Sequence, residues 1–129
     1  MIREEIDILY SIAAVLLFVT GLAHSYLGER YILARLFRQN ELPKIFGDTT
    51  FTKDTLRFAW HLTTIAWWGF AFILLSLADS PPNPSLIGNV IGATFLVHSG
   101  VALFGSKGKH LSWISFLLIG SMVVYASNT

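Results

Sequence analysis

The chain has 129 residues, of which 53% are hydrophobic and 13% are charged, and its formal net charge at pH 7 is +1. This apolar content exceeds that of a typical soluble domain and predicts an integral protein of the lipid bilayer. The small net charge, with no basic stripe, excludes a nucleic-acid partner. The absence of cysteine excludes disulfides, thiolate zinc sites and cysteine-ligated iron–sulfur clusters.

Four stretches of chain that are almost free of charge predict four transmembrane helices. The predicted spans lie near residues 7–28, 56–78, 85–105 and 110–127, because about 20 apolar residues are needed to cross the hydrocarbon core. The connections between the last three spans are short, so these spans should be antiparallel neighbours. We therefore predict a single all-α domain, an integral membrane up-down four-helix bundle.

The positively charged residues set the predicted orientation. Of the nine Lys and Arg residues, eight lie in or beside the loop over residues 29–54 or in the loop between the third and fourth spans. Cytoplasmic loops of membrane proteins are enriched in Lys and Arg. Both loops should therefore face the cytoplasm, and both termini should lie outside.

The loop over residues 29–54 begins with an amphipathic stretch. Tyr31–Arg38 alternates apolar and basic residues at helical spacing. This pattern predicts an interfacial helix, an extension of the first span, or a helix end that frays at the lipid headgroups. Helix-start signals are Thr52 or Asp54 for the second span and Asn83, which precedes a proline, for the third.

Each predicted span carries one histidine near its cytoplasmic end, and the four are His24, His61, His98 and His110. Imidazole is a common ligand of metals and of haem, and an ionisable group inside a membrane indicates a functional site by default. Each of the three deeper histidines has a threonine about one turn nearer the bilayer centre, namely Thr20, Thr64 and Thr94. We expect these polar stripes to face the bundle interior.

The leading hypothesis is a membrane cytochrome that binds one haem b. In a sequentially wound bundle, spans one and three are diagonal, so His24 and His98 could ligate one iron from opposite sides. The other two histidines form the second diagonal pair. Arg30 or Arg57, at the same interface, could hold the haem propionates. The function would then be electron transfer, with a quinol or a redox protein as the partner.

Two alternatives use the same side chains. In the first, a non-haem Fe, Cu or Zn ion is bound by several histidines together with Glu29, or less favourably Asp54. The histidines available to that ion are His24, His61, His98 and His110. In the second, the histidines hydrogen-bond to Glu29, Tyr26 and threonines without a cofactor, in an accessory or structural subunit. The oligomeric state stays open, and a homo-oligomer is compatible with either alternative.

Two strings in the first half of the chain carry a family resemblance. They are AHSYLGER at Ala23–Arg30 and LRFAWHLTT at Leu56–Thr64. Both resemble strings in small bacterial inner-membrane proteins with four predicted spans, a family without an assigned activity. The resemblance implies a bacterial inner-membrane location and groups His24, Glu29 and His61 into one unit. Trp67 and Trp68, at mid-span, could pack on a ligand or quinone ring, fill volume in the bundle, or face lipid.

Overall fold

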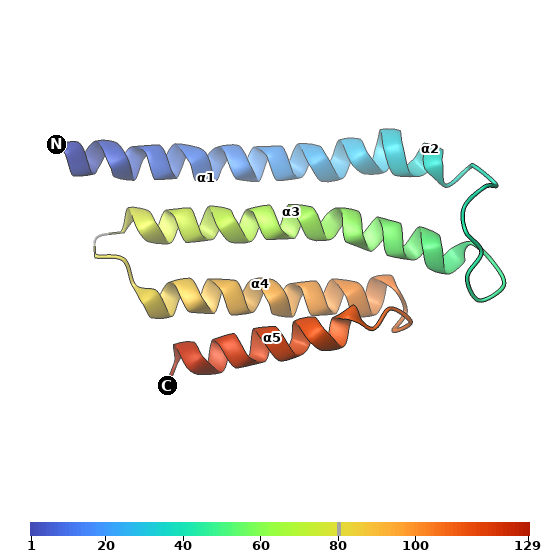
Figure 1. Cartoon of the computed structure of the whole chain (residues 1–129). Coiled ribbons are helices and arrows are strands. Elements are labelled where there is room, and N and C mark those ends of the chain that lie inside the picture. The colour runs from blue at the N-terminus through green and yellow to red at the C-terminus, as the bar shows by residue number, and fades with distance from the viewer. Residues whose placement is uncertain (80) are drawn as a thin grey trace.

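The computed structural model describes residues 1–79 and 81–129, and its regular secondary structure is entirely helical (Figure 1). The helices are α1 (Ile2–Leu27), α2 (Ala34–Leu36), α3 (Thr50–Ala78), α4 (Pro84–Gly105) and α5 (Ser112–Ser127). A π-helical segment, η1 (Gly28–Leu33), joins α1 to α2. The predicted all-α fold class is confirmed.

Three helices are long and apolar enough to cross a membrane. They are the continuous helix Ile2–Leu36, formed by α1, η1 and α2, and the helices α3 and α4. The helix α5 is also apolar but has only 16 residues. These lengths agree with an integral membrane protein. Most of the amphipathic stretch Tyr31–Arg38 extends the first span.

The helices α1, α3, α4 and α5 run alternately in opposite directions and lie in a row in this order (Figure 1). Contacts between them join α1 to α3, α3 to α4, and α4 to α5; within the described part of the chain, α1 contacts neither α4 nor α5. The expected closure into a bundle with diagonal pairs is therefore absent from this arrangement. Both termini lie at one end of the row, and the two basic loops lie at the other.

Small residues explain why each helix packs closely on its chain neighbour. Ala14, Gly21 and Gly28 follow one another at intervals of seven residues and are buried on one face of the first helix. Gly92 and Gly120 bring α4 and α5 together, because a Cβ on Gly120 would lie only 2.9 Å from the Gly92 carbonyl oxygen. In lipid, helices associate through such close packing. Each helix can therefore pack on its chain neighbour alone, and the helices need not close into a bundle.

The helix starts agree with prediction in one case and differ in another. Asn83 caps α4 as predicted, since its side chain accepts two backbone N–H bonds from the first turn. The helix α3 begins earlier than expected, and the carboxylate of Asp48 accepts the Thr50 N–H at 2.8 Å. The prediction that Thr52 or Asp54 caps this helix was wrong, because both residues lie inside it.

Candidate functional site

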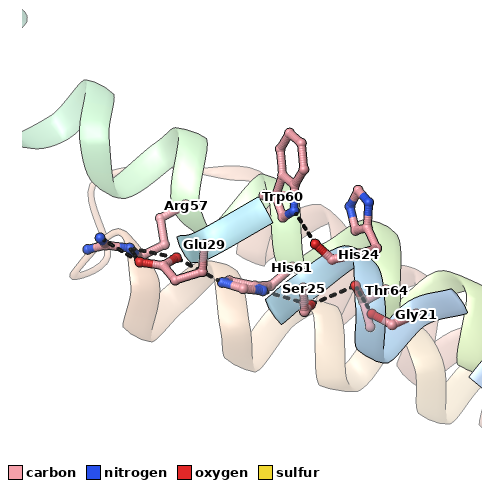
Figure 2. A network of polar contacts seen from close by, with 8 residues as sticks. All are labelled: Gly21, His24, Ser25, Glu29, Arg57, Trp60, His61 and Thr64. Carbon is pink, nitrogen blue, oxygen red and sulfur yellow. Dashed lines mark hydrogen bonds and ion pairs between the residues drawn. The ribbon is translucent and has the colours of Figure 1, made fainter. Parts of the chain in front are cut away.

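A carboxylate on η1 joins two basic side chains of α3 at the basic-loop end of the row. Arg57 Nη2 lies 2.8 Å from Glu29 Oε1, and His61 Nε2 lies 3.3 Å from Glu29 Oε2 (Figure 2). The Arg57 guanidinium also lies over the ring of Phe37, 5.0 Å from its centroid, which favours one orientation of the cation. Glu29 therefore binds a permanent cation and a titratable imidazole at the same time.

Hydroxyl groups continue this contact from His61 towards the middle of the helices. Ser25 Oγ lies 2.9 Å from His61 Nδ1 and 2.7 Å from Thr64 Oγ1. The Thr64 hydroxyl then donates to the Gly21 carbonyl at 3.2 Å. Figure 2 shows these side chains following one another along the α1–α3 interface. We call the connected series from Arg57 and Glu29 through His61, Ser25 and Thr64 to the Gly21 carbonyl the polar chain.

Helical spacing explains why the polar chain is continuous. Its members on α3 are separated by four and then three residues, and those on α1 and η1 by four, so each set lies along one helix face. The members also differ in exposure. Thr64 is 2% exposed, whereas the Glu29 side chain is 39% exposed. The polar chain therefore runs from an open edge into packed protein.

The polar chain permits two hydrogen-bond arrangements that differ by one proton. When His61 is neutral, the Ser25 hydroxyl donates to Nδ1, and Nε2–H donates to the Glu29 carboxylate. When His61 is an imidazolium, Nδ1–H donates to Ser25, whose hydroxyl turns to donate to Thr64. Thr64 donates to the Gly21 carbonyl in the second arrangement. Only hydroxyl hydrogens rotate between the two, because serine and threonine can both donate and accept.

A groove gives the polar chain access to small molecules. It has a volume of about 440 Å³ and is lined by Leu22, Ser25, Tyr26, Glu29, Arg30 and His61. At its rim, the Arg30 guanidinium donates to the Tyr26 hydroxyl at 2.6 Å. The groove therefore combines an apolar wall with a cation, a carboxylate and a histidine. A group that enters it meets both His61 and Ser25.

His24 lies next to the polar chain without belonging to it. Its ring stacks on Trp60 at a centroid distance of 4.6 Å and lies 4.8 Å from the Trp67 ring. Its Nε2 atom is buried, without a hydrogen-bond partner among the described residues. In Figure 2 the His24 ring points away from His61. The prediction that Thr20, one turn from His24, faces the bundle interior was wrong, because Thr20 is exposed.

The remaining two histidines have separate surroundings. His98 Nδ1 is 2.7 Å from the carbonyl oxygen of Thr94, and the His98 ring packs against Phe95 and Phe116. His110 Nδ1 lies 2.8 Å from Ser112 Oγ at the start of α5. Neither ring contacts the polar chain.

The structure thus separates the predicted cluster of four histidines. His61 contacts Glu29, which also binds Arg57, whereas His24, His98 and His110 each lie in another environment. Among residues 1–79 and 81–129, no group of three or more His, Cys, Asp or Glu side chains is close enough to hold one metal ion. The row explains this separation, because α3 lies between α1 and α4.

Two contacts of this site were not predicted from the sequence. Ser25 was not singled out, although it is four residues before Glu29 and therefore on the same helix face. The indole N–H of Trp60 donates to the His24 carbonyl at 3.0 Å, so this tryptophan holds α1 against α3. In the sequence, a tryptophan near the predicted interface is typical of an aromatic belt, and nothing there indicates this hydrogen bond.

Comparisons with known proteins add no further assignment. No protein-family model, no curated protein and no solved structure matches the chain.

Proposed function

We propose that this protein is a membrane proton-handling protein that takes up and gives up one proton at His61. The observation that supports this most is the continuity of the polar chain from Glu29 to Thr64. Its two hydrogen-bond arrangements keep every heavy atom in place, so protonation requires no rearrangement of the helices. Intramembrane ionisable groups are costly and are retained where they have a function.

Electrostatics favours proton storage at this position. Arg57 keeps its charge at all physiological pH values and lies against Glu29, so the carboxylate stays ionised and offers a counter-charge to a protonated His61. The Ser25 hydroxyl accepts from Nδ1–H in the charged state and donates to Nδ1 in the neutral state. The neighbouring groove would bind the molecule that receives the proton. Because an apolar wall and polar side chains line this groove together, that molecule should be an amphiphile with a polar head.

Ser25, His61 and Glu29 are also the residue types of a nucleophilic triad. An acyl transfer would need donors for the developing oxyanion. Ser25 lies inside α1, where backbone N–H groups are used by the helix, so proton exchange suits this site better. We expect no covalent labelling of Ser25 by a fluorophosphonate, and labelling would contradict the proposal.

The proposal can be tested by NMR of protein with ¹⁵N-labelled histidine in nanodiscs, while the pH is varied. We expect His61 to change between neutral and imidazolium forms. Glu29→Gln should remove the charged contact with His61 Nε2, so the ¹⁵N shift of that atom at a fixed pH should change. Glu41→Gln, which neutralises an exposed loop carboxylate, is the matched control and should have no effect. If His61 keeps one protonation state throughout, the proposal is wrong.

A further inference from the structure

A second groove lies between α3 and α4, outside the polar chain. Its volume is about 420 Å³, and its walls are mainly apolar, with Ala66 and Phe70 on α3 and Phe95 and His98 on α4. We call it the His98 groove. It extends along the helices from His98 as far as Ile73 and Ile91. Its size is within the range of small-molecule sites, which are apolar with few polar groups.

The hydrogen bond of His98 determines what this groove can recognise. A backbone carbonyl can only accept, so the 2.7 Å contact with Thr94 oxygen places the hydrogen of neutral His98 on Nδ1. The other nitrogen, Nε2, then carries a lone pair and acts as an acceptor. No hydrogen bond to Nε2 is found within the described part of the chain. His98 is 7% exposed and lines the groove, so its Nε2 lone pair is left for a donor that enters the groove.

We propose that the His98 groove binds the ring of a quinol, whose hydroxyl donates to His98 Nε2. A lipid acyl chain could fill the apolar volume, but it would leave the acceptor unpaired, which is unfavourable away from water. A flat aromatic head suits the rings of Phe70, Phe95 and Phe116, which line the same groove. The end of the groove at Ile73 and Ile91 is apolar, as an isoprenoid tail requires.

The two redox forms of the ligand should bind to the His98 groove with different affinities. A quinol hydroxyl is a donor, whereas a quinone carbonyl is only an acceptor and has no proton to offer the Nε2 lone pair. The site should therefore bind the reduced form more tightly. The inference does not depend on the proposed proton exchange at His61, because none of the residues in the polar chain lines the His98 groove.

The test is calorimetric titration of the full chain in nanodiscs, under anaerobic conditions, with ubiquinol-1, ubiquinone-1 and the dimethyl ether of ubiquinol-1. We expect ubiquinol-1 to bind about tenfold more tightly than either other compound, in proportion to one hydrogen bond. The dimethyl ether keeps the ring and loses both donors, so it tests the hydrogen bond without altering the protein.

Two variants locate the site. His98→Phe should lower the affinity for ubiquinol-1 to that for ubiquinone-1, and Ala66→Leu should weaken all three compounds by filling the groove. His24→Phe, a matched change outside the groove, should leave binding unchanged. The proposal is overturned if the three compounds bind equally, or if no binding exceeds that of protein-free nanodiscs. An affinity for ubiquinol-1 that survives both His98→Phe and Ala66→Leu would also overturn it.

Discussion

His61 Nε2 lies 3.3 Å from Glu29 Oε2 across the interface between α1 and α3, and the same carboxylate is bound by Arg57. This arrangement predicts energetic coupling between the two helices, in addition to that from their packing and from the hydrogen bonds of Ser25, Thr64 and Trp60. Because the three side chains are between 33% and 47% exposed, their interaction should be modest.

A double-mutant cycle over Glu29→Gln and Arg57→Gln measures this coupling. We expect about 0.5–1 kcal/mol in the free energy of unfolding, as for partly exposed ion pairs. The measurement is reversible unfolding of the purified protein in mixed micelles of increasing SDS content. Additive effects of the two substitutions would show that the ion pair does not contribute to stability.

Gly28 provides a test of the close contact between α1 and α3. A Cβ at this position would overlap the indole ring of Trp60, which also donates to the His24 carbonyl. We expect Gly28→Ala to destabilise the protein by about 1–3 kcal/mol, the usual cost of overpacking. The same unfolding measurement in mixed micelles applies.

Gly100→Ala is the matched control for Gly28→Ala. A Cβ at Gly100 would meet no atom within 4 Å, and alanine is a better helix former than glycine. Its stability should equal or exceed that of the original chain. Equal loss of stability in both variants would indicate a general effect of the substitution, independent of the Trp60 contact.

Much of the fold follows from the sequence, because helices in a membrane must satisfy their backbone within each segment. Uncharged stretches indicated where the helices are, and Asn83 before a proline indicated where α4 starts. The packing of the helices was less accessible. Whether four helices close into a bundle depends on which faces carry small residues, and Gly21 and Gly28 both face α3.

The candidate site was predicted only in part, for a reason that concerns helix phase. His24 and Ser25 are adjacent in sequence, but successive helix residues point in directions about 100° apart. The phase of α1 directs Ser25 to His61 and His24 to Trp60 and Trp67. The family resemblance grouped His24 with His61, and only the packing of α1 on α3 could separate them.

Asp48 predicts a pH dependence at the start of α3. Hydrogen bonds from the backbone and side chain of Thr50 hold the pKa of Asp48 below its ordinary value of 3.8. A lowered pKa means that the folded helix start favours the carboxylate, so its stabilisation is present at neutral pH. That stabilisation is lost as the pH falls below 3.8 through the folded pKa.

This effect is visible in the amide proton of Thr50. Its NMR chemical shift should titrate with the carboxyl group of Asp48, with a midpoint below 3.8. Asp48→Asn can still accept the hydrogen bond but cannot ionise, so its Thr50 shift should stay constant over the same range. A midpoint above 3.8 in the original chain would contradict the stabilisation of the Asp48 carboxylate by Thr50.

The distribution of positive charge predicts the orientation in the membrane, and the lack of cysteine makes it easy to test. Single cysteines can be introduced as Asn40→Cys in the long basic loop and Thr129→Cys at the C-terminus, both exposed positions. A membrane-impermeant maleimide should label Thr129→Cys in intact cells and Asn40→Cys only after lysis. The reverse pattern would show the opposite orientation.

Haem b ligation by His24 and His98 stays a prediction, and the row of helices limits how both residues can reach one iron. Because α3 lies between α1 and α4, one iron can join both residues only if these helices rearrange or two copies of the chain each supply a ligand. The hypothesis predicts a Soret band with sharp α and β bands after dithionite reduction of the purified protein. These bands should be lost in His24→Ala and in His98→Ala.

His110→Ala is the control for this spectrum, since His110 contacts Ser112 and two phenylalanines at the opposite edge of α3 from His24. It should retain the bands if the ligands are the predicted pair. A spectrum with only the ultraviolet protein band after haem-supplemented expression would contradict the haem hypothesis.

Metal analysis of the washed protein then distinguishes the two alternatives. Stoichiometric Fe, Cu or Zn that is lost in His61→Ala would indicate a non-haem site, whereas metal-free protein would favour proton exchange by the polar chain alone.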